Sequence, residues 1–139
     1  MLPMDAISPT ILVVDDDEDV RALAVSILHE AGCRALPAAN GDVALTLLQG
    51  GLAVDLLFTD IVMPGELDGL ALACEARRID PYIKILYTTG FSGFPRTGSS
   101  APLLGKVLSK PYRPAMLATE VMRLLNEPIL DTERPTARI

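Results

Sequence analysis

The feature that most constrains the fold is a regular alternation between short apolar segments and longer segments with helical periodicity. Each apolar segment has the length of a strand. In the segment after it, apolar side chains recur at helical spacing. This alternation predicts an α/β domain with a right-handed, doubly wound parallel sheet that carries helices on both faces. The five expected strands are residues 11–14, 34–38, 54–59, 83–88 and 106–109.

Five helices are expected between and after these strands, and one of them has an unusual sequence. The stretch 90–104, where the alternation requires a fourth helix, is rich in glycine, proline and serine. We therefore expect a short, irregular or mobile helix there. The other helices, bounded by capping residues, glycine or proline, are expected at about residues 17–31, 40–50, 70–79 and 114–128.

Length and composition indicate one domain that is neither exported nor inserted in a membrane. The chain has 139 residues, half of them apolar and none of them tryptophan, so an aliphatic core is expected. No run of about 20 apolar residues occurs, and residues 1–10 do not resemble a signal peptide. Cys33 and Cys74 are isolated, which favours reduced thiols and a cytoplasmic location. A net charge of −6 argues against nucleic acid as a direct ligand.

Aspartates stand where two of the expected strands end. Asp15 and Asp16 follow the first strand, and Asp60 follows the third. In a parallel sheet these ends lie side by side along the carboxyl edge, where ligands of open α/β sheets bind. The acid run that starts at Asp15 would by itself fit a helix N-terminus, and Asp60 alone would fit a turn cap. Two strands that both end in aspartate favour a Mg²⁺ site instead, because Mg²⁺ prefers carboxylate oxygens, waters and phosphate.

Two further polar residues, Thr89 and Lys110, follow the ends of the fourth and fifth expected strands. A lysine is a point-charge partner for a phosphoryl oxygen, and a threonine hydroxyl can donate a hydrogen bond to another. Lys110 alone would fit a solvated lysine before a turn proline. Taken together, the polar residues at four strand ends suit a divalent cation and a phosphoryl group.

These segments resemble the signature of response-regulator receiver domains of two-component signalling. The resemblance extends from Thr10 to about Asn126 and implies the flavodoxin-like strand order 2-1-3-4-5. The segments that carry it are residues 11–17, Asp60 to Pro64, Thr89-Gly90 and Ser109 to Tyr112.

The resemblance also implies roles for the acidic residues. Asp60 would be the phosphoacceptor, which attacks a phosphohistidine and becomes an aspartyl phosphate. Asp16 and Asp60 would bind Mg²⁺ directly, and Asp15 would act largely through water. The backbone carbonyl of Val62 would be a further ligand.

Lys110 and Thr89 would contact the phosphoryl group. Lys110 would bridge it to Asp60, with a cis Lys110–Pro111 peptide, and Thr89 would move toward a phosphoryl oxygen. The position in strand five that is often tyrosine or phenylalanine in this family is Val107 here. The usual inward swing of an aromatic ring together with Thr89 therefore cannot be carried over.

Other departures concern the loops. The loop 63–69 has one residue more than the commonest receiver spacing and resembles receivers attached to hybrid sensor kinases. Because the stretch 90–104 is atypical, we hypothesise that switching works by ordering this segment. Val62 and Phe91, two residues after Asp60 and Thr89, are both apolar, which predicts slow self-dephosphorylation.

Two alternative functions are weighed against this interpretation. A Mg²⁺-dependent phosphatase of the haloacid-dehalogenase type would need a different sequence after Asp15 and a later Asp-Asp pair. A receiver-like module that binds partners without phosphorylation would not need the intact acidic set and Lys110. A calcium-binding loop starting at Asp15 is excluded, because Val20 and Ser26 stand where glycine and glutamate are required.

The expected function is thus a phosphoacceptor in a phosphorelay, which catalyses only its own phosphorylation and dephosphorylation and is otherwise not an enzyme. Its expected partners are a sensor histidine kinase or a histidine phosphotransfer protein, and a downstream protein. Met1 and the short tail favour a stand-alone receiver over a fragment of a hybrid kinase. The expected organisation is an N-terminal arm at 1–10, a receiver domain at 11–126 and a C-terminal tail at 127–139.

Overall fold

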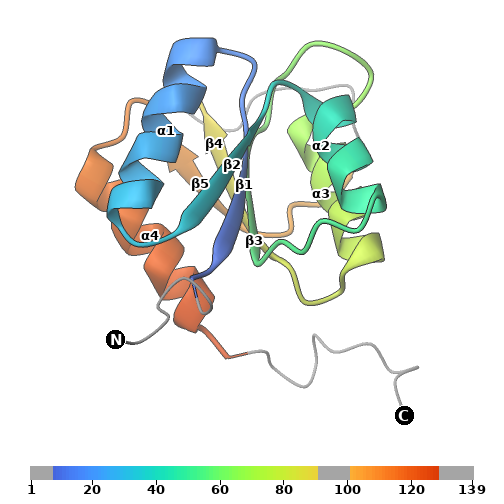
Figure 1. The fold of residues 1–139 in the computed structure, drawn as a ribbon. Coiled ribbons are helices and arrows are strands. Elements are labelled where there is room, and N and C mark those ends of the chain that lie inside the picture. Colours follow the sequence, from blue (N-terminus) through green and yellow to red (C-terminus); the bar gives the residue numbers. More distant parts are fainter. Residues whose placement is uncertain (1–7, 91–100, 129–139) are drawn as a thin grey trace.

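A single sheet of five parallel strands forms the centre of the structure, a computed structural model that describes residues 8–90 and 101–128 (Figure 1). Its strands are β1 (Thr10–Val14), β2 (Arg34–Ala38), β3 (Leu56–Asp60), β4 (Lys84–Thr89) and β5 (Lys106–Ser109). Their spatial order is β2-β1-β3-β4-β5, and every neighbouring pair is parallel. The strand order expected from the resemblance is confirmed.

Four helices occur within the described ranges. They are α1 (Glu18–Glu30), α2 (Gly41–Gln49), α3 (Gly69–Ile79) and α4 (Pro114–Asn126). Helices α1 and α4 pack together on one face of the sheet, and α2 and α3 pack together on the other (Figure 1). This confirms the doubly wound arrangement. The additional helix expected at 90–104 falls mainly on residues 91–100, which lie outside the described residues.

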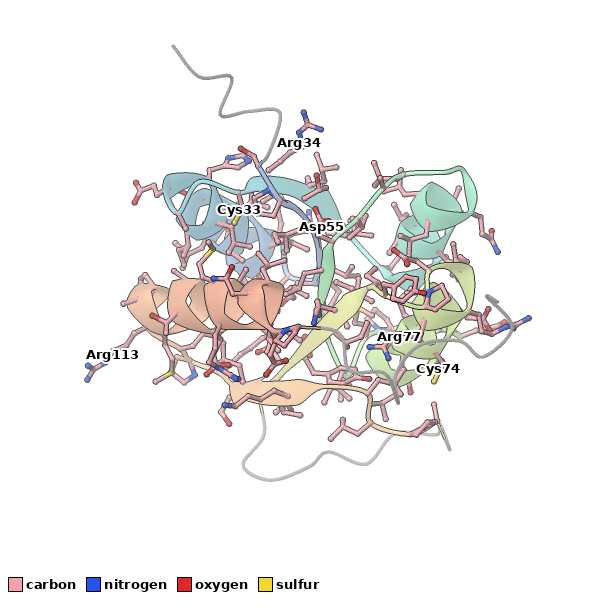
Figure 2. The ribbon with its side chains drawn as sticks, turned by 90° about the horizontal axis from the view of Figure 1, so that it is seen from below. Cys33, Arg34, Asp55, Cys74, Arg77 and Arg113 are labelled. Atoms are coloured by element: carbon pink, nitrogen blue, oxygen red, sulfur yellow. The ribbon has the colours of Figure 1, made fainter. Side chains whose placement is uncertain are left out.

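The core consists of two apolar clusters, one on each face of the sheet. Every residue of β1 and β3 is buried, because these central strands are covered by helices on both faces. Cys33 and Cys74 are free thiols that lie far apart in the structure (Figure 2). None of the helices in the described part of the chain has both the length and the apolar character needed to cross a membrane.

Three of the helices begin just beyond the carboxyl edge of the sheet with an acidic or amide N-cap. The side chains of Asp17, Asn40 and Asp68 each accept a backbone N–H of the first turn of α1, α2 and α3. Helix α4 has no side-chain cap and instead begins with Pro114, whose missing N–H costs nothing there. Short connections place the first turns of α1 and α2 close to the strand ends, and the hydrogen bond from the Gly69 N–H to the Ile61 carbonyl brings the start of α3 back to β3.

The sequence placed Asp60 and Thr89 just past their strands, whereas both are the last residue of a strand. The backbone pairing continues one residue further than the apolar run does. Asp60 pairs in register with Thr88, and Thr89 pairs with Ser109. The backbone carbonyl of Thr89 then accepts the N–H of Lys110 at 2.7 Å. The polar residues at the edge are therefore fixed by the sheet itself.

Candidate functional site

Three carboxylates meet at the carboxyl edge of β1 and β3. Asp15 directly follows β1, and the pairing of these strands in register places it beside Asp60, the last residue of β3. One carboxylate oxygen each from Asp15, Asp16 and Asp60 lie within 4.8 Å of one another. Asp15 and Asp60 are only 4% and 7% exposed, whereas Asp16 is exposed. The cluster is thus buried on one side and open to solvent on the other.

The backbone around Asp60 is held by close contacts. The Thr59 hydroxyl donates to the Asp60 carbonyl oxygen at 2.9 Å. A side chain at Gly69 would collide with the same carbonyl, so the start of α3 packs directly on the end of β3. The Gly69 N–H donates to the Ile61 carbonyl at 2.8 Å, and the Val62 N–H faces Asp60 Oδ1 at a longer 3.4 Å. Little freedom is left for the backbone that carries this carboxylate.

Lys110 links two of the three carboxylates. Its Nζ lies 2.9 Å from Asp60 Oδ2 and 3.0 Å from Asp15 Oδ2, and its side chain is 21% exposed. The Lys110–Pro111 peptide is cis, as expected. The sequence predicted a bridge from Lys110 to Asp60 but did not predict the ion pair with Asp15.

Burial and the ion pairs with Lys110 shift the pKa values of this cluster in opposite directions. Burial raises the pKa of Asp60, and the charge of Asp15 acts the same way, although the Lys110 ammonium opposes both. Burial alone would lower the pKa of Lys110, but its hydrogen bonds to Asp60 and Asp15 outweigh this and raise that pKa. Lys110 therefore stays protonated at neutral pH. Asp60 is a poorly solvated carboxyl group that is paired with this charged ammonium group.

Two residues to which the sequence analysis gave no role also lie near the site. Arg21 donates from Nη1 to the backbone carbonyl of Asp15 at 2.8 Å. The ring of Tyr112 meets that of Phe58 edge to face, with centroids 6.0 Å apart. Burial, with a smaller contribution from the Asp15 charge, raises the pKa of Tyr112 to about 12, so its hydroxyl stays neutral. The position of Tyr112 directly after Lys110-Pro111 was the available signal, whereas nothing in the sequence marks Arg21.

The roles expected of Val62 and Thr89 stay predictions. Val62 is 39% exposed in the loop after Asp60. Thr89 is 2% exposed at the end of β4, where its backbone carbonyl fixes the start of the Lys110 loop.

The strand-five position without an aromatic ring lies next to a buried tyrosine. Val107 pairs in register with Tyr87 of β4, which is completely buried. The Tyr87 hydroxyl accepts the backbone N–H of Leu104 at 3.1 Å. Tyr87 therefore attaches the segment before β5 to the centre of the sheet.

The donor set at the carboxyl edge fits a hard divalent cation. In their ionised forms, three carboxylates and one ammonium group leave an excess of negative charge within a few ångströms. Carboxylate oxygens with water are the ligands that Mg²⁺ prefers, and the exposed Asp16 leaves access for water. The same arrangement, with Lys110 close by, suits an incoming phosphoryl group.

Comparison with known proteins agrees with this arrangement. Residues 11–122 match the sequence family described as "Response regulator receiver domain". The response regulator receiver protein CpdR of Brucella abortus (strain 2308) is 42% identical over 116 residues, which cover 83% of this chain and 95% of CpdR. The sensor kinase CckA of the same organism is 35% identical over 123 residues, but this match covers only 13% of CckA.

A solved structure shows the same fold over most of its length. The response regulator receiver protein from Sinorhizobium medicae WSM419 superposes with a TM-score of 0.75 at 32% sequence identity. The match covers 87% of this chain and 97% of that structure. With its sequence, strand order and acidic cluster in agreement, the chain belongs to the response regulator receiver domains of two-component signalling.

Proposed function

We propose that this protein is a phosphoacceptor in a phosphorelay, which takes a phosphoryl group from a phosphohistidine onto Asp60. The observation that carries the proposal is the placement of Asp60. It is a buried carboxylate, 2.9 Å from the Lys110 ammonium, beside two further carboxylates at the carboxyl edge of the sheet. A sensor histidine kinase or a histidine phosphotransfer protein would be the donor, and the phosphorylated form would bind a downstream protein.

The transfer requires little chemistry from the protein beyond position and charge. An oxygen of the ionised Asp60 carboxylate attacks phosphorus, so an O–P bond forms as the P–N bond of the phosphohistidine breaks. The electron pair of the broken bond stays on the imidazole nitrogen. Lys110, which stays protonated, would contribute a positive charge to the phosphoryl oxygens. No oxidant or reductant is needed.

Mg²⁺ would be held by Asp16 and Asp60 directly, by Asp15 largely through water, and by the Val62 carbonyl. A divalent cation in this place neutralises charge on the phosphoryl group. Its binding would also compensate the excess negative charge of the three carboxylates. The acidic cluster that contains the acceptor thus supports the proposed requirement for Mg²⁺.

Outside this reaction we propose no activity toward other substrates. The protein would catalyse only its own phosphorylation and dephosphorylation and would act in the cytoplasm, where its phosphodonor is made. Membership of the receiver family supports this proposal over a haloacid-dehalogenase phosphatase. A module that works without phosphorylation would be the conclusion only if the following experiment failed.

The test is incubation of the folded protein with Mg²⁺ and a small phosphodonor such as phosphoramidate. We expect one base-labile acyl phosphate per chain, detected by mass spectrometry, and none in Asp60→Asn. Asp55→Asn is the matched control, because Asp55 precedes the same strand at its opposite end (Figure 2). Absence of an acyl phosphate in the folded wild type, or its presence in Asp60→Asn, would contradict the proposal.

A further inference from the structure

Thr88 lies beside the proposed acceptor, one residue before the end of the adjacent strand β4. It pairs in register with Asp60, so the two side chains project from the same face of the sheet. On its other side Thr88 pairs with Leu108 of β5. Lys110, two residues after Leu108, reaches Asp60 on the far side of β4 at 2.9 Å. The lysine side chain therefore crosses the end of β4, where Thr88 lies.

The hydroxyl group of Thr88 is a buried polar group without a partner. Thr88 is 1% exposed, and within residues 8–90 and 101–128 its Oγ1 is the single buried side-chain polar atom that makes no hydrogen bond. Buried hydroxyl groups are nearly always hydrogen-bonded, because leaving one unpaired costs free energy. Such an exception beside a reactive carboxylate points to a partner that becomes available during the reaction.

The hydrogen bonds of Asp60 have to change when it is phosphorylated. Its Oδ2 accepts from Lys110 at 2.9 Å, and its Oδ1 has only the long 3.4 Å contact with the Val62 N–H. In the transfer proposed above, one of these oxygens bonds to phosphorus, and the charged phosphoryl oxygens attract Lys110. The oxygen that remains the Asp60 carbonyl would hold the proposed Mg²⁺ with one lone pair and can accept a hydrogen bond with the other.

We propose that Thr88 is a positioning residue for phosphorylation, whose hydroxyl donates a hydrogen bond to the Asp60 oxygen that does not bond to phosphorus. The inference rests on the proposed function. Thr88 gives up no proton, so the bonds that form and break are those of the transfer itself. Because the donor is unpaired beforehand and paired in the transition state, it lowers the barrier rather than tightening phosphodonor binding.

The test compares Thr88→Val, which removes the hydroxyl with little change of shape, with Thr88→Ser, which keeps it. Thr10→Val is the matched control, because Thr10 is a buried threonine at the amino end of β1, away from the carboxylate cluster. Phosphorylation by phosphoramidate with Mg²⁺ is followed against phosphodonor concentration. We expect Thr88→Val to lower the maximal rate constant about three- to tenfold, the effect of one hydrogen bond, with half-saturation unchanged. Thr88→Ser and Thr10→Val should stay near the wild-type rate.

Stability measured without phosphodonor separates this role from a structural one. The urea midpoint of Thr88→Val should equal or exceed that of wild type, because the variant removes an unpaired hydroxyl. Equal maximal rates for wild type and Thr88→Val, or a slower rate together with a lower midpoint, would overturn the inference and leave the proposed function intact. A wild type that is not phosphorylated at Asp60 would contradict the proposed function, and this inference with it.

Discussion

Strand β3 has an aspartate at each end, and the two differ in almost every physical respect. Asp55, just before the strand, is exposed, and its Oδ2 accepts the Thr10 backbone N–H at 2.8 Å. Asp60, at the other end, is buried, paired with Lys110 and close to the carboxylates of Asp15 and Asp16. One carboxylate satisfies a backbone donor and lowers the energy of the fold. The other holds a poorly solvated charge, which is useful for chemistry but unfavourable for folding.

The largest effect should come from removing the cation at the carboxyl edge. Lys110→Met leaves Asp15 and Asp60 buried without their counter-charge, so unfolding free energy at pH 7 should fall by about 3 kcal/mol. Urea denaturation measures the change. The control is Lys106→Met, whose lysine forms an exposed pair with Glu120 at 3.3 Å and should matter by less than about 1 kcal/mol. Equal losses in both variants would show that the two lysines are in equivalent surroundings.

Added Mg²⁺ should stabilise the protein through the same carboxylates. At a concentration one hundred times its dissociation constant, one bound cation raises the unfolding free energy by about 2.7 kcal/mol. The shift is read from thermal melts at constant ionic strength, with and without MgCl₂. It should persist in Asp55→Asn and disappear in Asp60→Asn. A shift of similar size in Asp60→Asn would place the cation elsewhere.

A smaller effect concerns the pH dependence of stability without divalent cations. Because the pKa of Asp60 is raised in the folded state, the folded protein binds this proton more tightly than the unfolded chain does. The Asp60 contribution is therefore favourable at low pH and is lost as pH rises above the ordinary value of 3.8 through the folded pKa. Asp60→Asn should gain stability relative to wild type over that window. Parallel stability curves from pH 3 to pH 7 would contradict the assigned environment of Asp60.

The smallest effect is expected at the amino end. Asp55→Asn keeps an oxygen that accepts the Thr10 N–H, so its unfolding free energy should change by less than about 0.5 kcal/mol. Asp55→Ala removes the acceptor and should cost about 1 kcal/mol. Neither change should alter the phosphorylation rate. A slower rate in Asp55→Asn would mean that the two ends of β3 are coupled.

Most of the fold could be predicted from the sequence because each strand and helix has its own local signal. The periodicity does not define which strands are neighbours, so the order 2-1-3-4-5 came from the resemblance. The backbone pairing of Asp60 and Thr89 was missed because it continues past the apolar runs.

The carboxylate cluster was predictable for a related reason, since parallel strands end at the same edge whatever their order. Contacts across strands were not. The Lys110–Asp15 pair, the Arg21 contact and the unpaired hydroxyl of Thr88 depend on lateral register and on side-chain conformations. No spacing in the sequence determines these.

The hydrogen bond between Tyr87 and Leu104 has a consequence for how the fold tolerates changes of sequence. It ties the chain before β5 to β4, the strand from which the preceding connection starts. Closing a loop between two such fixed points has an entropic cost that grows slowly, by about 0.6 kcal/mol for each doubling of length. An insertion before Leu104 should therefore leave this hydrogen bond, and with it the start of β5, in place.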